Sequence, residues 1–119
     1  MLAPYTLPAR ARLRTRREFD FVFRKGRKLV GAAYICYVAR QPETGTKLGM
    51  AVSRKVGNAV VRNRVKRHIR EFFRMHRAQL PAGTHLVVVA RPRAAGFENA
   101  RESAKALHGI LVRGEWLDG

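Results

Sequence analysis

Positively charged side chains are concentrated in one stretch of the sequence, from Arg54 to Arg77. This stretch contains nine Lys and Arg residues and one acidic residue, Glu71. An ordinary solvated helix mixes both signs, because Glu–Lys pairs four residues apart stabilise a helix whereas like charges repel. Between residues 58 and 77 the cations are six arginines and one lysine, and guanidinium groups bind phosphate through paired hydrogen bonds. The stretch therefore indicates binding to a polyanion.

The same stretch separates into two faces when it is read as a helix of about 100° per residue. The apolar side chains fall within an arc of about 120° that we expect to face the core, and they are Val61, Val65, Ile69, Phe72 and Phe73. The opposite side carries Lys66, Arg67, Arg70, Arg74 and Arg77, while Arg62 and Arg64 flank the apolar arc. Because the core needs the apolar arc, binding to a membrane surface is disfavoured.

Aromatic side chains form a second candidate site in the first half of the chain. Phe19 and Phe23 lie one helical turn apart, and Tyr34 and Tyr37 lie on the following predicted strand. Aromatic rings near cations can stack unpaired bases, although a phenylalanine is more often a core residue. Tyr34 and Tyr37 have opposite parity, so only one of them can face a given groove. Phe21 points to another side of its helix, and no role is assigned to it.

No constellation of residues resembles a catalytic or metal site. The four histidines (His68, His76, His85 and His108) are not spaced like metal ligands, and Ser53 has no evident base partner. No glycine-rich phosphate loop is present. We therefore expect no catalytic residue and no metal ligand in the protein.

The overall composition agrees with a nucleic-acid partner. The 119 residues suffice for one domain, and the net charge is 25 − 8 = +17. An anionic membrane is the second candidate partner, and added solubility is a weaker explanation. Cys36 is the single cysteine, which fits a reducing compartment, and neither a signal peptide nor a membrane span is predicted. We expect a cytoplasmic protein.

Local patterns predict three helices and one mixed sheet of about four strands, a small α+β domain. A capping box at Thr15 and Glu18 begins a helix over 16–25, and Asn58 begins the main helix, which ends near Arg77. Residues 29–40 and 47–53 are predicted to pair as an antiparallel hairpin, with a break near Gly31 that splits off a short strand. The apolar run 84–90 fits a buried central strand, and a last helix follows over 98–113. Residues 1–14 are expected to be a basic arm, 15–113 the domain and 114–119 a tail.

The run LGMAVSRKVGNAVVRNRVKRHIREFFR, residues 48–74, closely resembles the signature region of the bacterial ribonuclease P protein component. The likeness extends outward to Arg17–Phe23 with Lys25-Gly26, and to the run LVVVARP at 86–92. It covers about residues 13–112. Phe21 departs from the polar residue expected at its position.

The resemblance implies a subunit that binds a catalytic RNA and the 5′ leader of precursor tRNA, with one protein for each RNA. It implies that the RNA removes the leader with Mg²⁺ held mainly by the RNA, and that the fold contains a left-handed β-α-β crossover. The residues that match the family's contacts to the catalytic RNA are Arg62, Asn63, Arg64, Lys66, Arg67 and Arg70. A cleft for the leader is implied to use Phe19, Phe23, Tyr34 or Tyr37, Arg54 and Lys55.

Two other hypotheses explain the charge. A structural RNA-binding protein, either ribosomal or an RNA chaperone, would have a similar composition and no dependence on a leader. A nucleoid protein would bind duplex DNA as well as structured RNA, but the sequence contains no clear recognition helix for a major groove.

Overall fold

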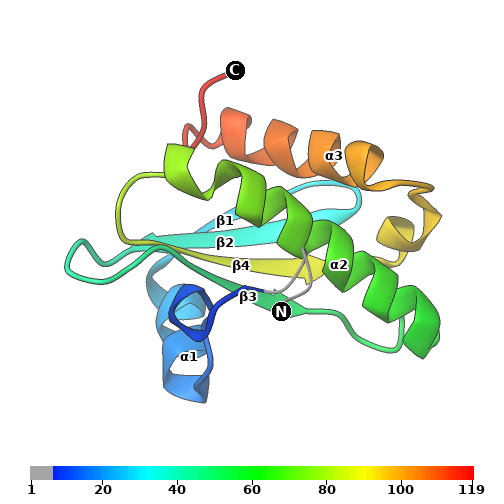
Figure 1. Cartoon of the computed structure of the whole chain (residues 1–119), viewed down its shortest axis with the longest axis horizontal. Coiled ribbons are helices and arrows are strands. Elements are labelled where there is room, and N and C mark those ends of the chain that lie inside the picture. Colours follow the sequence, from blue (N-terminus) through cyan, green and yellow to red (C-terminus); the bar gives the residue numbers. More distant parts are fainter. Residues whose placement is uncertain (1–6) are drawn as a thin grey trace.

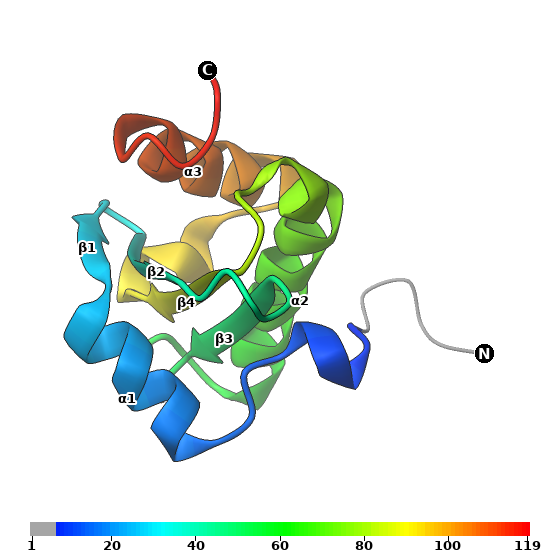
Figure 2. The ribbon, with the colours of Figure 1, turned by 90° about the vertical axis from the view of Figure 1, so that its left-hand side faces the viewer.

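The computed structural model describes residues 7–119, which fold into one four-stranded sheet with helices on both faces. The helices are α1 (Arg16–Lys25), α2 (Ala59–His76) and α3 (Ala100–Arg113), and short 3-10 turns are η1 (Ala9–Ala11), η2 (Arg77–Gln79) and η3 (Pro92–Gly96). The strands are β1 (Arg27–Val30), β2 (Tyr34–Arg40), β3 (Lys47–Ala51) and β4 (Thr84–Ala90). Helices α2 and α3 cover one face of the sheet, and α1 lies against the other (Figures 1 and 2).

The order of the strands is β1-β2-β4-β3, with β4 antiparallel to β2 and parallel to β3. The predicted hairpin of 29–40 with 47–53 is therefore wrong, because β4 lies between them. The run 84–90 is nearly continuous in apolar residues and is buried. A strand of this kind is typical of the interior of a sheet that is covered on both faces. Its prediction as the central strand is confirmed, and so is the break near Gly31, which separates β1 from β2.

The parallel pair β3 and β4 is connected through α2. In Figure 1 both strands run in the same direction, α2 lies in front of them and β4 lies above β3. This arrangement makes the crossover left-handed, as the family resemblance implies and against the usual preference. Gly83 permits the return into β4: its φ is +78°, and its backbone packs so closely on Gln41 that an added Cβ would collide with the Gln41 carbonyl oxygen.

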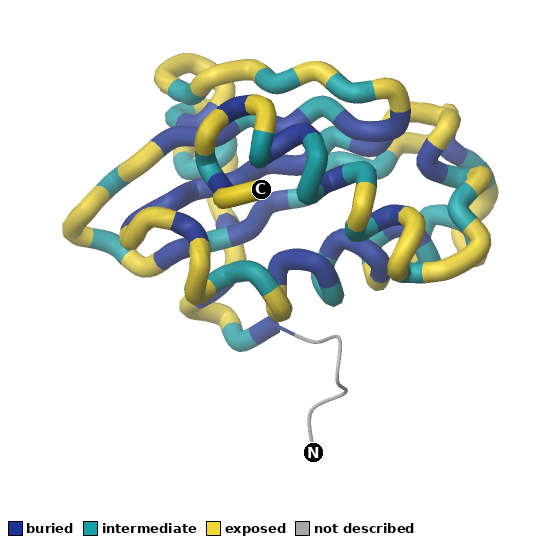
Figure 3. The backbone as a smooth tube through the Cα atoms, turned by 90° about the horizontal axis from the view of Figure 1, so that it is seen from above, coloured by how far each residue is buried: buried dark blue, intermediate teal, exposed yellow. Residues whose placement is uncertain are grey.

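The main core lies between the sheet and the pair α2 and α3, and Figure 3 shows the buried positions gathered there. A smaller apolar patch lies under α1, formed by Leu13, Val22, Ala39 and Val87. Apolar residues alternate along the strands, which sends even-numbered β2 residues to α2 and α3 and odd-numbered ones toward α1.

The predicted basic arm is partly built into the domain. Residues 1–6 lie outside the described part of the chain, but Leu7, Ala11 and Leu13 are buried. The Leu13 amide donates to the Leu48 carbonyl oxygen at 2.9 Å, so this segment covers the exposed edge of β3. The predicted tail also packs, since Leu117 is buried and its amide donates to the Leu111 carbonyl.

The caps that the sequence predicts for α1 and α2 are both confirmed. The side chain of Asn58 accepts a hydrogen bond from the Val61 amide and begins α2. At α1, Thr15 Oγ1 accepts from the Glu18 amide, and Glu18 Oε1 accepts from the amides of Thr15 and Arg14. The hydrogen bond from the Arg14 amide is the largest influence that lowers the pKa of Glu18 from its ordinary value of 4.5 to about 2.

We predict that Glu18 makes stability depend on acid pH. Because the folded-state pKa of Glu18 lies below its value in the unfolded chain, its contribution is complete above about pH 4.5 and is lost as the pH falls toward about 2. Urea unfolding of Glu18→Gln across this range should show a weaker fall in the free energy of unfolding than the native chain shows. Asp20→Asn, on the same helix but exposed, is the matched control. Equal pH dependence in the native chain and Glu18→Gln would contradict the assignment.

Candidate nucleic-acid interface

The apolar arc predicted for α2 is confirmed by its burial. Val65, Ile69, Phe72 and Phe73 are almost fully buried against the sheet and α3, and Val61 packs at the edge of this core. His68 is also buried, although it was not among the residues predicted for the apolar arc. Burial, and next the charges of Arg67 and Arg64, lower the pKa of His68, so this histidine is neutral and adds no charge to the helix.

The outer side of α2 carries several cations, whereas the whole helix has a single carboxylate. We call this surface the cationic face, and it consists of Arg62, Asn63, Lys66, Arg67 and Arg70. Glu71 is the single acidic residue of α2, and it pairs with Arg74 at 2.7 Å. Burial, followed by the charges of Arg12 and Arg67, lowers the pKa of Arg70. The like charges thus repel one another, and an approaching anion would relieve that repulsion.

Arg64 faces a different direction from the cationic face. Its Nη2 donates to the Ala95 carbonyl oxygen at 2.9 Å, which ties α2 to η3. The Nη2 group of Arg64 therefore stabilises the contact between α2 and η3. The sequence could not distinguish Arg64 from Arg62, because the partner carbonyl lies 31 residues further along the chain.

Three aromatic rings form a cluster on the α1 side of the sheet, which we call the aromatic platform. The ring centroids of Phe19 and Phe23 lie 6.4 Å apart, and those of Phe23 and Tyr37 lie 4.8 Å apart with an edge-on orientation. Phe23 is 41% exposed, and Lys28 Nζ lies 6.0 Å from the centre of the Tyr37 ring. A cluster with a partly exposed ring and a nearby cation can receive an unpaired base and its phosphate.

Tyr34 does not belong to this platform, so the prediction that it could contact the leader is wrong. Its parity places it on the other face of β2, under α3, where it is fully buried. The Tyr34 hydroxyl lies 2.7 Å from Ser103 Oγ, and its ring stacks on Phe97 with centroids 6.0 Å apart. Tyr34 is a core residue, and Tyr37 is the one tyrosine of the pair that faces α1.

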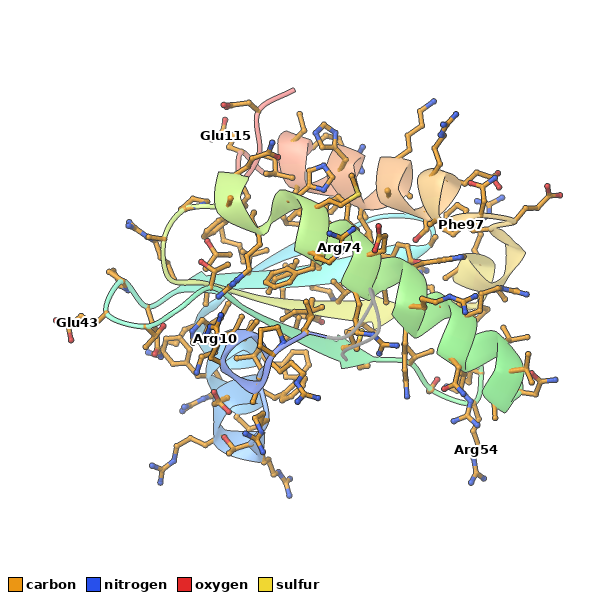
Figure 4. All side chains as sticks on the ribbon, in the orientation of Figure 1. Arg10, Glu43, Arg54, Arg74, Phe97 and Glu115 are labelled. Carbon is orange, nitrogen blue, oxygen red and sulfur yellow. The ribbon has the colours of Figure 1, made fainter. Side chains whose placement is uncertain are left out.

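Arg54 and Lys55 are both exposed in the loop that joins β3 to α2. Figure 4 shows Arg54 projecting away from the body of the domain at the N-terminal end of α2. The two residues follow the end of β3, whereas Glu18 of α1 reaches Lys47 at its beginning. Phe19 of α1 lies against Gly49 in the middle of β3, so Arg54 and Lys55 lie beyond it, past the C-terminal end of the same strand.

A hollow at the edge of β3 lies between the cationic face and the aromatic platform. We call it the edge hollow; its volume is about 390 Å³, and its lining includes Arg12, Leu13, Phe19, Gly49 and Arg70. Gly49 is required for this arrangement, because an added Cβ would lie 2.7 Å from the Phe19 ring. Arg12 and Gly49 were not predicted as site residues. The glycine within a strand was the available signal, since it marks close approach by another group.

Candidate metal ligands do not cluster within residues 7–119. Within this part of the chain, no three His, Cys, Asp or Glu side chains are placed to hold a metal ion. Burial raises the pKa of the Cys36 thiol to about 12, so it is an unreactive core residue. No helix among the described residues has the length and apolar character needed to cross a membrane.

Comparison with known proteins identifies close similarities over almost the whole chain. A family model described as Ribonuclease P matches residues 7–113. A relative from Desulfovibrio desulfuricans, named ribonuclease P protein component, is 44% identical over 87% of this chain and 82% of its own length. One of the same name from Exiguobacterium sibiricum is 36% identical over 88% of this chain and 91% of its own length.

Solved structures support the same relationship. The RNase P protein of Staphylococcus aureus superposes with a TM-score of 0.82 and 28% identity, covering 91% of this chain and 98% of that protein. The RNase P protein of Thermotoga maritima superposes with a TM-score of 0.75 and 30% identity, covering 86% of this chain and 96% of that protein.

We predict that Arg64 contributes to folding as well as to charge. Arg64→Gln should lower the free energy of unfolding by about 1 kcal/mol, since the hydrogen bond to the Ala95 carbonyl is removed. Asn63→Ala, exposed on the neighbouring position of α2, should change it little. Urea unfolding measures both. Equal stabilities of the two variants would show that the bond to η3 contributes nothing.

Proposed function

Because the chain belongs to the ribonuclease P protein family, we propose that it acts where the catalytic RNA of ribonuclease P meets the 5′ leader of precursor tRNA. Family membership makes the chain a subunit of ribonuclease P, a partner of the RNase P RNA and a participant in tRNA 5′ processing. The proposal adds a division of the surface between two RNAs. The edge hollow supports it most directly, because Arg70 of the cationic face and Phe19 of the aromatic platform both line it.

The cationic face binds the catalytic RNA in this proposal. Its side chains lie on one rigid helix whose opposite face is anchored in the core, so their spacing is fixed before the RNA arrives. Arginine forks can pair with phosphates of irregular geometry, which suits a folded RNA better than a regular duplex. The repulsion between Arg70 and its neighbours Arg12 and Arg67 is relieved when phosphates lie between them.

The aromatic platform binds the single-stranded leader. Stacking on aromatic rings tolerates any base, because every base offers a flat face. A platform of Phe19, Phe23 and Tyr37 therefore suits a leader whose sequence differs from one precursor to the next. Lys28, near Tyr37, and the exposed Arg54 and Lys55 supply positive charge for the leader phosphates.

The protein assists cleavage by binding and positioning, and the RNA performs hydrolysis. Within residues 7–119 no cluster of side chains is placed to hold a metal ion. The proposed role of the protein therefore involves binding and positioning of RNA. Mg²⁺ held by the RNA supplies the metal chemistry implied by the family resemblance. One protein acts with one RNA in the cytoplasm.

Reconstitution with the cognate RNase P RNA tests the proposed role of the cationic face. The native chain should increase cleavage of precursor tRNA at Mg²⁺ concentrations too low for the RNA alone. Arg62→Ala should weaken binding to the RNase P RNA and reduce the slope of log affinity against log salt by roughly one for each phosphate that is no longer neutralised. Arg101→Ala, an exposed cation on α3, is the control. No gain in cleavage from the native chain would refute the function, and an unchanged salt slope in Arg62→Ala would remove Arg62 from the interface.

The two tyrosines should respond to substitution in opposite ways. Tyr37→Leu should weaken binding of precursor tRNA with a leader by about 1–3 kcal/mol, the contribution of one stacked base, with no effect on mature tRNA. Tyr34→Phe should leave leader binding intact but lower stability by about 1 kcal/mol, because the hydrogen bond with Ser103 is removed. Equilibrium binding at matched folded fraction and urea unfolding separate these effects. A leader-specific defect in Tyr34→Phe would contradict the assignment.

A further inference from the structure

A second hollow lies on the flank of α1 that faces away from the aromatic platform. We call it the flank hollow; its volume is about 420 Å³, and its lining includes Arg17, Phe21, Arg24, Thr44, Lys47 and His85. It is formed between α1, the loop that joins β2 to β3, and the first residues of β3 and β4. None of these side chains belongs to the cationic face or to the aromatic platform.

Positive charge exceeds negative charge around the flank hollow. Arg17 and Arg24 are exposed, and Lys47 is half-buried. Glu18 is the one carboxylate in the lining, and it is engaged by the Arg14 and Thr15 amides and by Lys47 at 3.4 Å. Three cations against one committed carboxylate attract an anion, and the low pKa of Glu18 shows that its hydrogen bonds already stabilise its charge.

The flank hollow also offers groups that suit a base rather than a bare phosphate. Phe21 is half-buried, so part of its ring stays accessible beside the cations. His85 is 3% exposed, its Nε2 lies 2.8 Å from Thr44 Oγ1, and its Nδ1 has no hydrogen-bond partner among the described residues. Burial, and next the charge of Lys47, lower the pKa of His85, so the ring is neutral and lines the hollow without adding charge.

A shallow hollow across the outer side of α1 connects this site to the aromatic platform. It is lined by Arg16, Arg17, Asp20, Phe23 and Arg24. Phe23 is shared with the aromatic platform, and Arg17 and Arg24 are shared with the flank hollow. A single strand of RNA that left the platform over α1 would cross three arginines, Phe23 and one carboxylate, Asp20, which lies 4.0 Å from Arg16 Nε. The path therefore carries a net positive charge.

We propose that the flank hollow binds a nucleotide of the 5′ leader further from the cleavage site than those on the aromatic platform. Its base packs against Phe21, and its phosphates lie on Arg17, Arg24 and Lys47. This inference rests on the proposed leader-binding function and extends it: α1 becomes a ridge over which the leader bends, with a stacking surface on each side. It also gives a role to the part of the Phe21 ring that stays accessible where Phe21 packs against the small apolar patch under α1.

Leader length provides the test, using the full chain assembled with its RNase P RNA. Precursor tRNAs whose leaders increase by one nucleotide at a time should bind the native complex more tightly until the flank hollow is filled. Phe21→Leu keeps an apolar side chain in the small core but removes the ring. We expect it to weaken only the longer leaders, by about tenfold, as for the removal of one stacked base.

A paired charge variant avoids dependence on the packing of Phe21. Arg17→Gln with Arg24→Gln removes two exposed cations and should also weaken only the longer leaders, while reducing the salt slope for those leaders by roughly two. Arg101→Gln with Arg113→Gln, two exposed cations on α3, removes the same charge from the other face of the sheet and should affect all leaders equally and weakly.

The outcomes separate the inference from the function on which it rests. Weakening confined to long leaders in both α1 variants supports the flank hollow as a leader site. Equal weakening for short and long leaders, or none at all, overturns it while the aromatic platform keeps its role. A native complex whose affinity is the same with and without a leader overturns the leader-binding function itself and the inference with it.

Discussion

The accumulation of like charge on α2 is the constraint on which the structure depends. The helix holds several guanidinium groups on one surface with a single carboxylate among them, so its own electrostatics oppose its formation. Two features of α2 compensate for that repulsion. The Asn58 cap stabilises the beginning of the helix, and the apolar arc, which includes Ile69 and Phe72, is buried in the core. Burial, and next the charges of Arg12 and Arg67, lower the pKa of Arg70, and phosphates bound at the cationic face would relieve the repulsion among these cations. The charge of α2 therefore favours a polyanionic partner at the cationic face.

The position of β3 turns this charged helix into part of a larger interface. Because β4 occupies the interior of the sheet, β3 lies at its edge. The left-handed crossover that follows β3 places α2 on the face of the sheet opposite α1 (Figures 1 and 2). The edge of β3 is where Arg12, Phe19 and Arg70 meet around Gly49. The topology therefore brings the cationic face and the aromatic platform to the same edge of the sheet.

The parts of this arrangement that depend on local sequence could be predicted, and those that depend on distant partners could not. Caps and the spacing of apolar residues located α1 and α2, because each signal lies within a few residues of the position that it controls. Strand pairing has no such local signal, so β4 was not placed between β2 and β3. Parity separated Tyr34 from Tyr37 but could not say which face α1 covers. The role of Arg64 depended on the position of Ala95, which only the folded chain reveals.

One surface of this protein is proposed to contact the catalytic RNA, and an adjoining surface is proposed to contact the leader. Site-specific photocrosslinking in the assembled complex with precursor tRNA tests this division most directly, with a benzophenone side chain placed at Arg67 in one variant and at Phe23 in another. We expect the probe on α2 to attach to the RNase P RNA and the probe on α1 to attach to the leader of the precursor. Attachment of both probes to the same RNA would contradict the division of the surface, even if the complex remained active.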